Sequence, residues 1–250
     1  MGPRKILGFA AAVLLTLVLV LPSGFSTAAT RTDSLVYLPL LVMNGAPPAA
    51  GPTATMTPKP TTGLAILENR TVFTDSIDYV HIVGEVQNNG SSNLEFVKVI
   101  ADFFNGTQLV ADDITYTHLN TLLPGERTCF EILVSGPLAW TSYQFEAPSF
   151  SVTSQSRPAL SISGDSGSID PTFNWYRVLG MERNDGATPL SFAKVVGTLY
   201  NAGGDVIGCG LAYANSTSLA AGQSSSFTMT FTGRDYYDAT SYRLQTDGTP

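Results

Sequence analysis

The sequence predicts an all-β protein built from two tandem β-sandwich domains, and three observations support this prediction. Residues 84–105 (GEVQNNGSSNLEFVKVIADFFN) recur with substitutions as residues 180–201 (GMERNDGATPLSFAKVVGTLYN). Short segments alternate apolar and polar residues between turns rich in Gly, Asn and Pro, which is the pattern of half-buried strands. No segment combines a sustained helical period with helix caps. Strands of this length and spacing are typical of sandwiches.

The repeat is as long as a whole domain. Its two blocks align at a constant shift of 96 residues, which one extra residue in a later turn changes to 97. Solenoid units span only a few dozen residues, so this is a copied domain rather than a repeat array. We expect a first sandwich over residues 63–155 and a second over residues 156–250. Matched positions include Gly84 with Gly180, Asn88 with Asn184, Gly125 with Gly222 and Phe130 with Phe227.

The composition excludes one class of partner. Charged residues make up 13% of the chain, and the formal net charge is −7. Ser, Thr, Gly and Asn take the place of Lys and Glu, which suits strands with polar turns and disfavours long exposed helices. A nucleic-acid partner is excluded, because the sequence has no basic stripe that could neutralise phosphates.

Residues 1–29 have the features of a signal peptide. Arg4 and Lys5 precede an uncharged apolar run over residues 6–21, and Thr27, Ala28 and Ala29 fit a signal-peptidase site. The run is short for a membrane-spanning helix, which favours cleavage. We therefore expect a secreted or cell-surface protein. The alternative is an uncleaved leader, which would be the only membrane anchor.

Residues 30–62 form a predicted connection between the leader and the first domain. An apolar patch over residues 36–43 is followed by a Pro- and Thr-rich stretch over residues 45–62. Such a stretch cannot bury enough apolar surface to fold and favours extended geometry. We interpret it as a disordered spacer.

In the first copy, period-two patterns predict strands in order. Val80, Ile82 and Val86 form one face of a strand whose other face carries His81 and Glu85. The longest strand follows over residues 94–104, and Asn105-Gly106 predicts a hairpin into a return strand over residues 109–116. Further strands are expected over residues 128–134 and 142–152.

The second copy repeats these patterns. Alternating apolar residues over 193–199 predict the inner face of its long strand, and residues 201–205 (NAGGD) predict the hairpin turn. Phe227, Met229 and Phe231 alternate with polar residues and predict a further strand. Residues 154–158 connect the copies, as either a rigid joint or a hinge.

The repeated block resembles the FxLYD domain, a small extracellular module of bacteria and archaea. The resemblance rests on residues 84–90 (GEVQNNG), 96–99 (FVKV), 103–105 (FFN) and 122–126 (LLPGE) in the first copy. In the second copy, residues 195–204 (VVGTLYNAGG) match the name-giving element more closely, but residues 221–223 (AGQ) stand where the family favours Pro-Gly-Glu. The resemblance implies immunoglobulin-like sandwiches on a secreted or surface protein. It implies no catalytic residues.

No catalytic constellation, metal site or cofactor site is expected. The two histidines, His81 and His118, lack ligand spacing or a triad pattern, and we interpret both as solvated surface residues. Residues 164–167 (GDSG) are interpreted as a turn. Asp112 and Asp113 are adjacent on a strand and so face opposite sides, which disfavours a shared calcium ion.

Cys129 and Cys209 are the only cysteines, and export would place both in an oxidising compartment. They occupy non-equivalent positions of the repeat. A bond between them would therefore staple one domain to the other. Each copy is large enough to fold without such a staple, so paired and unpaired cysteines both remain open.

The predicted function is a non-enzymatic structural or interaction module whose partner is an extracellular protein or glycan. The alternative is a carbohydrate- or small-ligand-binding module that uses aromatic residues of the second domain as a stacking platform. Core packing is the competing fate of these aromatics. The candidate binding residues are Trp175, Tyr176, Tyr236 and Tyr237.

Overall fold

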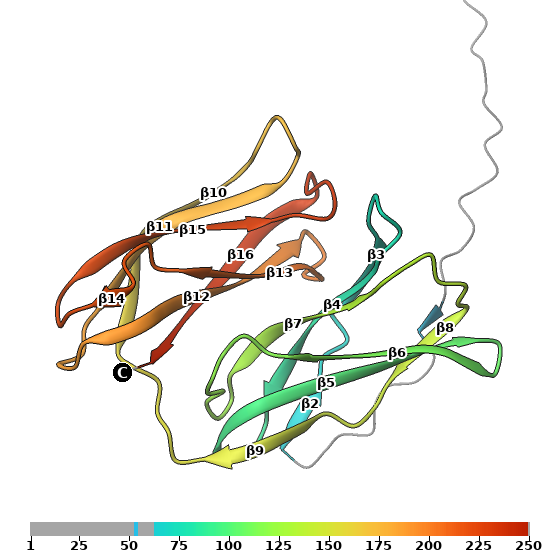
Figure 1. Cartoon of the computed structure of the whole chain (residues 1–250), viewed down its shortest axis with the longest axis horizontal. Helices are drawn as coiled ribbons and strands as arrows, with labels where there is room; N and C mark the ends of the chain where they lie inside the picture. Colours follow the sequence, from blue (N-terminus) through green and yellow to red (C-terminus); the bar gives the residue numbers. More distant parts are fainter. Residues whose placement is uncertain (1–52, 55–62, 250) are drawn as a thin grey trace, which may run out of the picture. The chain divides into compact units, whose positions relative to one another are not determined.

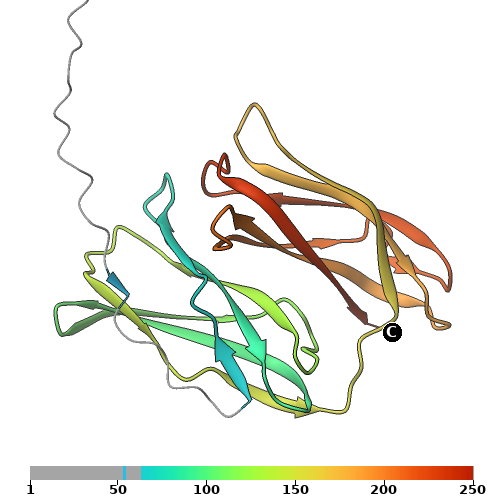
Figure 2. The ribbon, with the colours of Figure 1, turned by 180° about the vertical axis from the view of Figure 1, so that it is seen from behind.

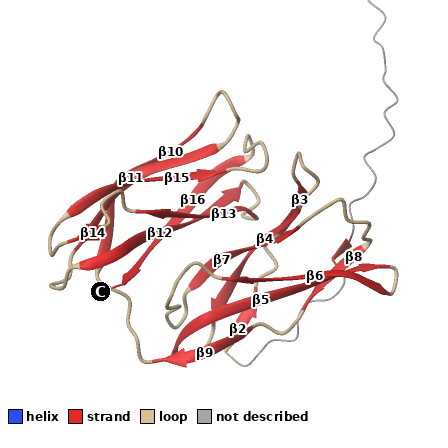
Figure 3. Ribbon diagram, in the orientation of Figure 1, coloured by secondary structure: helices blue, strands red, loops and turns tan. Residues whose placement is uncertain are grey.

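The structure, a computed structural model, describes residues 53–54 and 63–249, all of which belong to one compact unit. Every regular element of these residues is a β-strand (Figures 1 and 3), which confirms the predicted all-β class. Within them there is no helix that could cross a membrane. The predicted signal peptide, the apolar patch and most of the predicted spacer lie outside the described residues.

Strands from residues 53–54 and 64–153 form two sheets, which we call sheets A and B. Sheet A has the order β1-β8-β5-β6, with β9 also paired to β5, and in sheet B both β2 and β3 pair with one edge of β4 and β7 with the other. Sheet A comprises β1 (Thr53–Ala54), β5 (Asn93–Asn105), β6 (Gln108–Tyr116), β8 (Ser142–Phe145) and β9 (Ser149–Thr153). Sheet B comprises β2 (Leu64–Ile66), β3 (Thr71–Thr74), β4 (Val80–Asn88) and β7 (Arg127–Val134).

Strands from residues 160–249 form two further sheets, C and D. Sheet C has the order β10-β11-β15, and in sheet D the central strand β12 pairs with β13, β14 and β16. Sheet C comprises β10 (Leu160–Ile169), β11 (Tyr176–Asn184) and β15 (Ser224–Phe231). Sheet D comprises β12 (Leu190–Asn201), β13 (Val206–Tyr213), β14 (Ser218–Leu219) and β16 (Ala239–Thr249). The segment after β9 leads into β10, as Figure 2 shows from behind.

The strand registers of the two sheet pairs match at the shifts of the sequence repeat. Gly84 lies opposite Phe130 in sheet B, and Gly180 lies opposite Phe227 in sheet C. A Cβ on either glycine would approach its phenylalanine ring within 2.8 and 2.7 Å, respectively. Glycine is thus required at both positions because an equivalent buried phenylalanine ring leaves no room for a Cβ. Sheet B therefore corresponds to sheet C, and sheet A to sheet D.

A buried asparagine closes the same turn in both halves. Asn88 donates to the carbonyl oxygens of Ser92 and Leu122, and its Oδ1 accepts from the amide of Gly90. Asn184 repeats this pattern with the residues at the matching positions. Each side chain bonds three backbone groups and so ties the turn after its strand to a segment about 35 residues further along the chain. The repeated Asn is therefore a structural residue.

A repeated bulge exposes one phenylalanine in each half. Phe96 and Phe192 have φ angles of 49° and 50°, and their side chains are 67% and 65% exposed. Each lies at a register shift of the long strand, in β5 and in β12. Positive φ is uncommon for a bulky residue, so the bulge geometry is imposed by the pairing around it.

Two predictions about local structure are wrong. Residues 164–167 do not form a turn between strands but lie within β10, where Gly164 has a φ of 62° and the register shifts between Ser163 and Ser166. In addition, two residues of the predicted spacer, Thr53 and Ala54, pair in parallel with β8.

The connection between the halves is anchored on both sides. Arg157 forms an ion pair with Glu126 and donates to the carbonyl oxygen of Thr246. The side chain of Gln245 also donates to Glu126, at 2.8 Å. Of the two alternatives for residues 154–158, these bonds favour a rigid joint.

Candidate functional site

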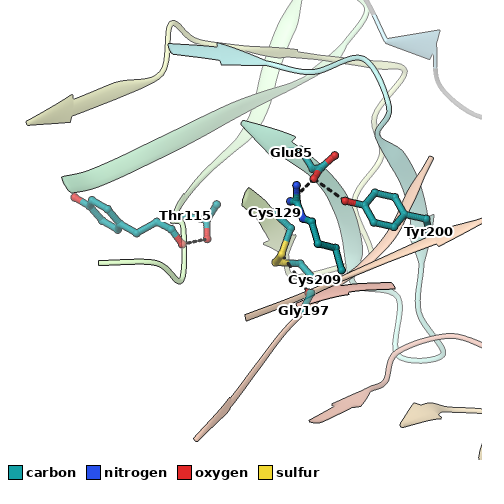
Figure 4. The surroundings of a disulfide bond; sticks show 8 residues. Glu85, Thr115, Cys129, Gly197, Tyr200 and Cys209 are labelled. Carbon is teal, nitrogen blue, oxygen red and sulfur yellow. Dashed lines mark hydrogen bonds and ion pairs between the residues drawn. A yellow bond between two sulfur atoms is a disulfide. The ribbon is translucent and has the colours of Figure 1, made fainter. Parts of the chain in front are cut away.

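The two halves meet where sheet D lies against sheet B, and a disulfide crosses this seam. Cys129 of β7 and Cys209 of β13 are bonded, with their Cα atoms 5.6 Å apart (Figure 4). Cys129 is fully buried. The cystine therefore joins the halves, which is the stapled alternative among the two that the sequence left open.

Glu85 is a buried carboxylate at the centre of the same seam. It accepts hydrogen bonds from Tyr200 at 2.8 Å and from Arg243 at 2.6 Å, both from the second half (Figure 4 shows the bond to Tyr200). Asn69 donates to its other oxygen at 2.8 Å, and Arg127 lies 3.5 Å from that oxygen. Burial, and then the bond to Glu85, raise the pKa of Tyr200 to about 12. A buried carboxylate needs such partners, since an unpaired one would be strongly destabilising.

The predicted exposure of His81 is wrong, because the second half covers the outer face of β4. His81 is only 6% exposed, and Val83 and Glu85 on the same face are fully buried. The ring of His81 stacks on Phe73 with centroids 4.5 Å apart. A period-two pattern identifies one buried face, and here a neighbouring sheet buries the other face as well.

Both nitrogens of His81 are held by carboxylates. Its Nδ1 lies 2.7 Å from Glu131 and its Nε2 lies 3.3 Å from Asp75. Burial alone would lower the pKa of His81, but the hydrogen bonds to the two carboxylates outweigh it and raise that pKa. The arrangement favours the protonated ring over the neutral one, and both ring nitrogens are engaged by carboxylates.

Both histidines line one cavity at the seam. This inner cavity has a volume of about 410 Å³, and residues of both halves surround it. His118 and Glu131 line it from the first half, and Phe231 and Tyr236 from the second. Burial, and then the nearby charge of Lys194, lower the pKa of His118. Among the described residues, no three His, Cys, Asp or Glu side chains are grouped so as to hold a metal ion.

A second, outer cavity of about 630 Å³ shares Asp75, Thr232 and Gly233 with the inner one. Its aromatic wall is Phe173 stacked on Trp175, with ring centroids 4.6 Å apart and 22° between the planes. Phe173 is 55% exposed. Arg234 also lines this cavity and is held by two 2.7 Å bonds to Asp238. The outer cavity thus offers an aromatic face beside a fixed cation and the carboxylate of Asp75.

The structure separates the four aromatics that were predicted to bind a ligand. Tyr176 and Tyr236 are buried in the core of the second half, 9% and 2% exposed, where both contact Phe231. The hydroxyl of Tyr236 donates to the carbonyl oxygen of Thr232. Trp175 lines the outer cavity, whereas Tyr237 is 67% exposed outside that lining and donates to Asn174. Only Trp175 therefore reaches a cavity from an accessible position.

Sequence reasoning missed Phe173 and Arg234, which complete the aromatic wall and the charge of the outer cavity. Phe173 lies two residues before Trp175, a spacing that could have suggested a pair on one side of the chain. Arg234 carried no comparable signal, because its place depends on the loop between β15 and β16.

A buried carboxyl group in the second half has no hydrogen-bond partner among the described residues. Both side-chain oxygens of Glu182 are buried without one, on the inward face of β11. Burial, and then the charge of Asp247, raise the pKa of Glu182 to about 7. The matching residue of the first half is Val86, which is also fully buried.

Replacing His81 by glutamine is expected to destabilise the protein by about 1–2 kcal/mol near pH 6 and by less at higher pH. The raised pKa of His81 stabilises the folded state fully below the unfolded value of about 6.5. That contribution is lost as the pH rises through the folded pKa. Urea unfolding of both proteins between pH 5.5 and 9 would measure the difference.

His118→Gln is the matched control for this prediction. Because burial lowers the pKa of His118, the wild-type protein loses stability relative to this variant as the pH falls below about 6.5. The two variants should therefore have opposite pH slopes. Parallel slopes would show that the two carboxylates do not raise the pKa of His81.

Comparison with known proteins gives no family. No protein-family model and no curated protein matches the sequence. Among solved structures, an exo-chitosanase of Amycolatopsis orientalis aligns with 72% of this chain at 9% identity and a TM-score of 0.27. A red sea bream transglutaminase aligns with 74% at 11% identity and a TM-score of 0.22. The chain spans only 25% and 28% of these two proteins, and similarity at this level carries no argument about activity.

Proposed function

We propose that the protein is a non-enzymatic structural or interaction module, exported to the cell surface or the medium, whose two halves act as one rigid body. The observation that carries this proposal is the seam. A cystine and a buried carboxylate with partners from both halves fix one sheet on another. Such a body holds its outer sheet faces at a constant separation and angle, which is what a spacer or a docking platform requires.

The geometry around His81 supports a non-enzymatic role. Its two ring nitrogens are occupied by Glu131 and Asp75, so neither can accept a proton from a nucleophile. The resemblance to the FxLYD domain, which implies no catalytic residues, is in keeping with this proposal and remains a prediction.

Two measurements test the proposed function. Labelled chain should bind the surface of the cells that export it in a saturable way, and unlabelled chain should compete. Ester, peptide and glycoside substrates should show no turnover. Turnover that disappears in a His81→Ala/His118→Ala variant would refute the non-enzymatic role. A lack of saturable binding would refute the interaction role.

The second candidate is a glycan- or small-ligand-binding module, and the outer cavity favours it. The stacked Phe173 and Trp175 offer a ring face, and Asp75 and Arg234 offer polar groups beside it. Sugar rings bind to such combinations of an aromatic face and a few placed polar groups.

A glycan array tests this candidate directly. Binding by the wild-type chain that is lost in Trp175→Ala and Phe173→Ala would support it. Phe192→Ala is the control, because Phe192 is 65% exposed and lies outside the cavity lining. Equal binding by all four proteins would exclude the outer cavity as the site.

A further inference from the structure

The seam between the halves joins two different kinds of sheet face. Strands β12 and β13 of sheet D contact β4 and β7 of sheet B. Sheets A and D are equivalent in the repeat, and so are sheets B and C. The seam therefore pairs a face of the A/D type with a face of the B/C type. One face of each type remains uncovered by the described residues, namely the outer face of sheet A and the outer face of sheet C.

The apolar contact at the seam has a counterpart on the two uncovered faces. Val83 packs with Tyr200 and Val206 in a buried cluster across the seam. The repeat places Leu179 at the position of Val83, Phe104 at that of Tyr200 and Leu109 at that of Val206. Leu179 is 45% exposed and Leu109 is 51% exposed, although both are apolar. The three residues on the uncovered faces are thus apolar or aromatic, like the three that pack together at the seam.

The residues that form the ion pair at the seam are replaced by uncharged residues at the matching positions of the two uncovered faces. Glu85 bonds Arg243 across the seam. Met181 lies at the position of Glu85, beside Ser226, as Glu85 lies beside Cys129. Asp102 and Thr198 are matching positions of the repeat. Gln144 lies opposite Asp102, and Arg243 lies opposite Thr198, so Gln144 stands at the position of Arg243. Packing sheet C on sheet A in the geometry of the seam would therefore bury no counterpart of the Glu85–Arg243 pair. It would bring the carboxylate of Asp102 to the position of Thr198, which is fully buried at the seam.

The positions of the cystine also correspond to a compatible pair. Ser226 lies at the position of Cys129 and Asp112 at that of Cys209. Both side chains are exposed, and a serine hydroxyl can donate to a carboxylate. The contact that is covalent within the chain would thus be a hydrogen bond between chains.

We propose that the outer face of sheet C of one copy packs on the outer face of sheet A of a second copy, in the register of the internal seam. This inference rests on the proposed structural function and names its partner as the protein itself. The contact is heterologous, because the two faces differ, and each added copy presents the same free face again. The expected product is a linear head-to-tail assembly rather than a closed dimer.

Cysteine cross-linking tests the register. Purified full-length Asp112→Cys and Ser226→Cys chains, mixed and oxidised, should give a disulfide-linked dimer far above the yield of either chain alone. The Asp112→Cys/Ser226→Cys double variant should give a ladder of higher species. Thr107→Cys with Ser226→Cys is the matched control, since Thr107 is exposed in the turn after β5, and it should give only background.

Sedimentation of chains without added cysteines provides a second measurement. The wild-type chain should form larger species as its concentration rises, and Leu179→Asp or Leu109→Asp should reduce this at least tenfold. Ile77→Asp, on an exposed residue outside both faces, should not. A monomer at every concentration, or an Asp112→Cys chain that cross-links preferentially to itself, would overturn the proposal. Either result would leave the saturable binding of the proposed function unaffected.

Discussion

Replacing both Cys129 and Cys209 by alanine is expected to lower the free energy of unfolding by about 4 kcal/mol. The bond closes a loop between residues 80 positions apart. Without it the unfolded chain gains conformational freedom, while the folded chain loses the disulfide that crosses the seam. Guanidinium unfolding of the oxidised wild-type chain and the double variant, under identical conditions, would measure the difference.

The two single variants are the controls for this result. Cys129→Ala and Cys209→Ala each remove the cross-link, so both should be destabilised nearly as much as the double variant. A double variant with wild-type stability would contradict the prediction. So would a stability loss in only one of the single variants, because that loss would come from packing around one sulfur rather than from the bond.

Replacing Glu182 by valine is expected to raise the free energy of unfolding by about 3 kcal/mol above pH 7. Burial raises the pKa of this carboxyl to about 7, from an ordinary value of 4.5. The folded state therefore binds the proton more tightly than the unfolded state does. Ionisation carries no penalty below about pH 4.5, and the penalty grows until the pH passes the folded pKa. Urea unfolding of both proteins from pH 4 to pH 8 would follow it.

Two variants separate charge from packing at this position. Glu182→Gln should gain stability at high pH but not at pH 4, because it removes the ionisation and keeps the polar group. Val86→Glu, at the matching position of the first half, should destabilise the protein most above pH 7. A Glu182→Val variant that gains the same stability at every pH would show that ionisation does not contribute.

Period-two patterns and turn residues predicted the strands well. The long strand expected over residues 94–104 is β5, which spans Asn93–Asn105, and the Asn-Gly hairpin joins it to β6 as expected. The shift of the repeat also predicted which strand residues correspond, because Gly84 and Gly180 meet equivalent phenylalanines. These features depend on local backbone preferences and on contacts within one sheet pair.

The candidate site was predicted poorly, for a physical reason. Its residues are brought together by the seam, where the face of β4 that reads as polar is covered by another sheet. Val83 interrupts the polar face between His81 and Glu85 and was the one local sign of a second buried surface. The positions of the two cysteines could be compared in the sequence, but their distance could not, since it depends on how the halves pack.

Glu85 has a consequence for how such a chain can evolve. In a protein of independently folding domains, recombination can exchange, delete or reorder the domains without loss of their stability. Here the first copy depends on Tyr200 and Arg243 of the second to satisfy a carboxylate in its own central strand. A gene that inherits only one copy would inherit a surface adapted to a missing neighbour. Selection should therefore retain the pair as a single heritable piece, with new copies added only beyond its ends.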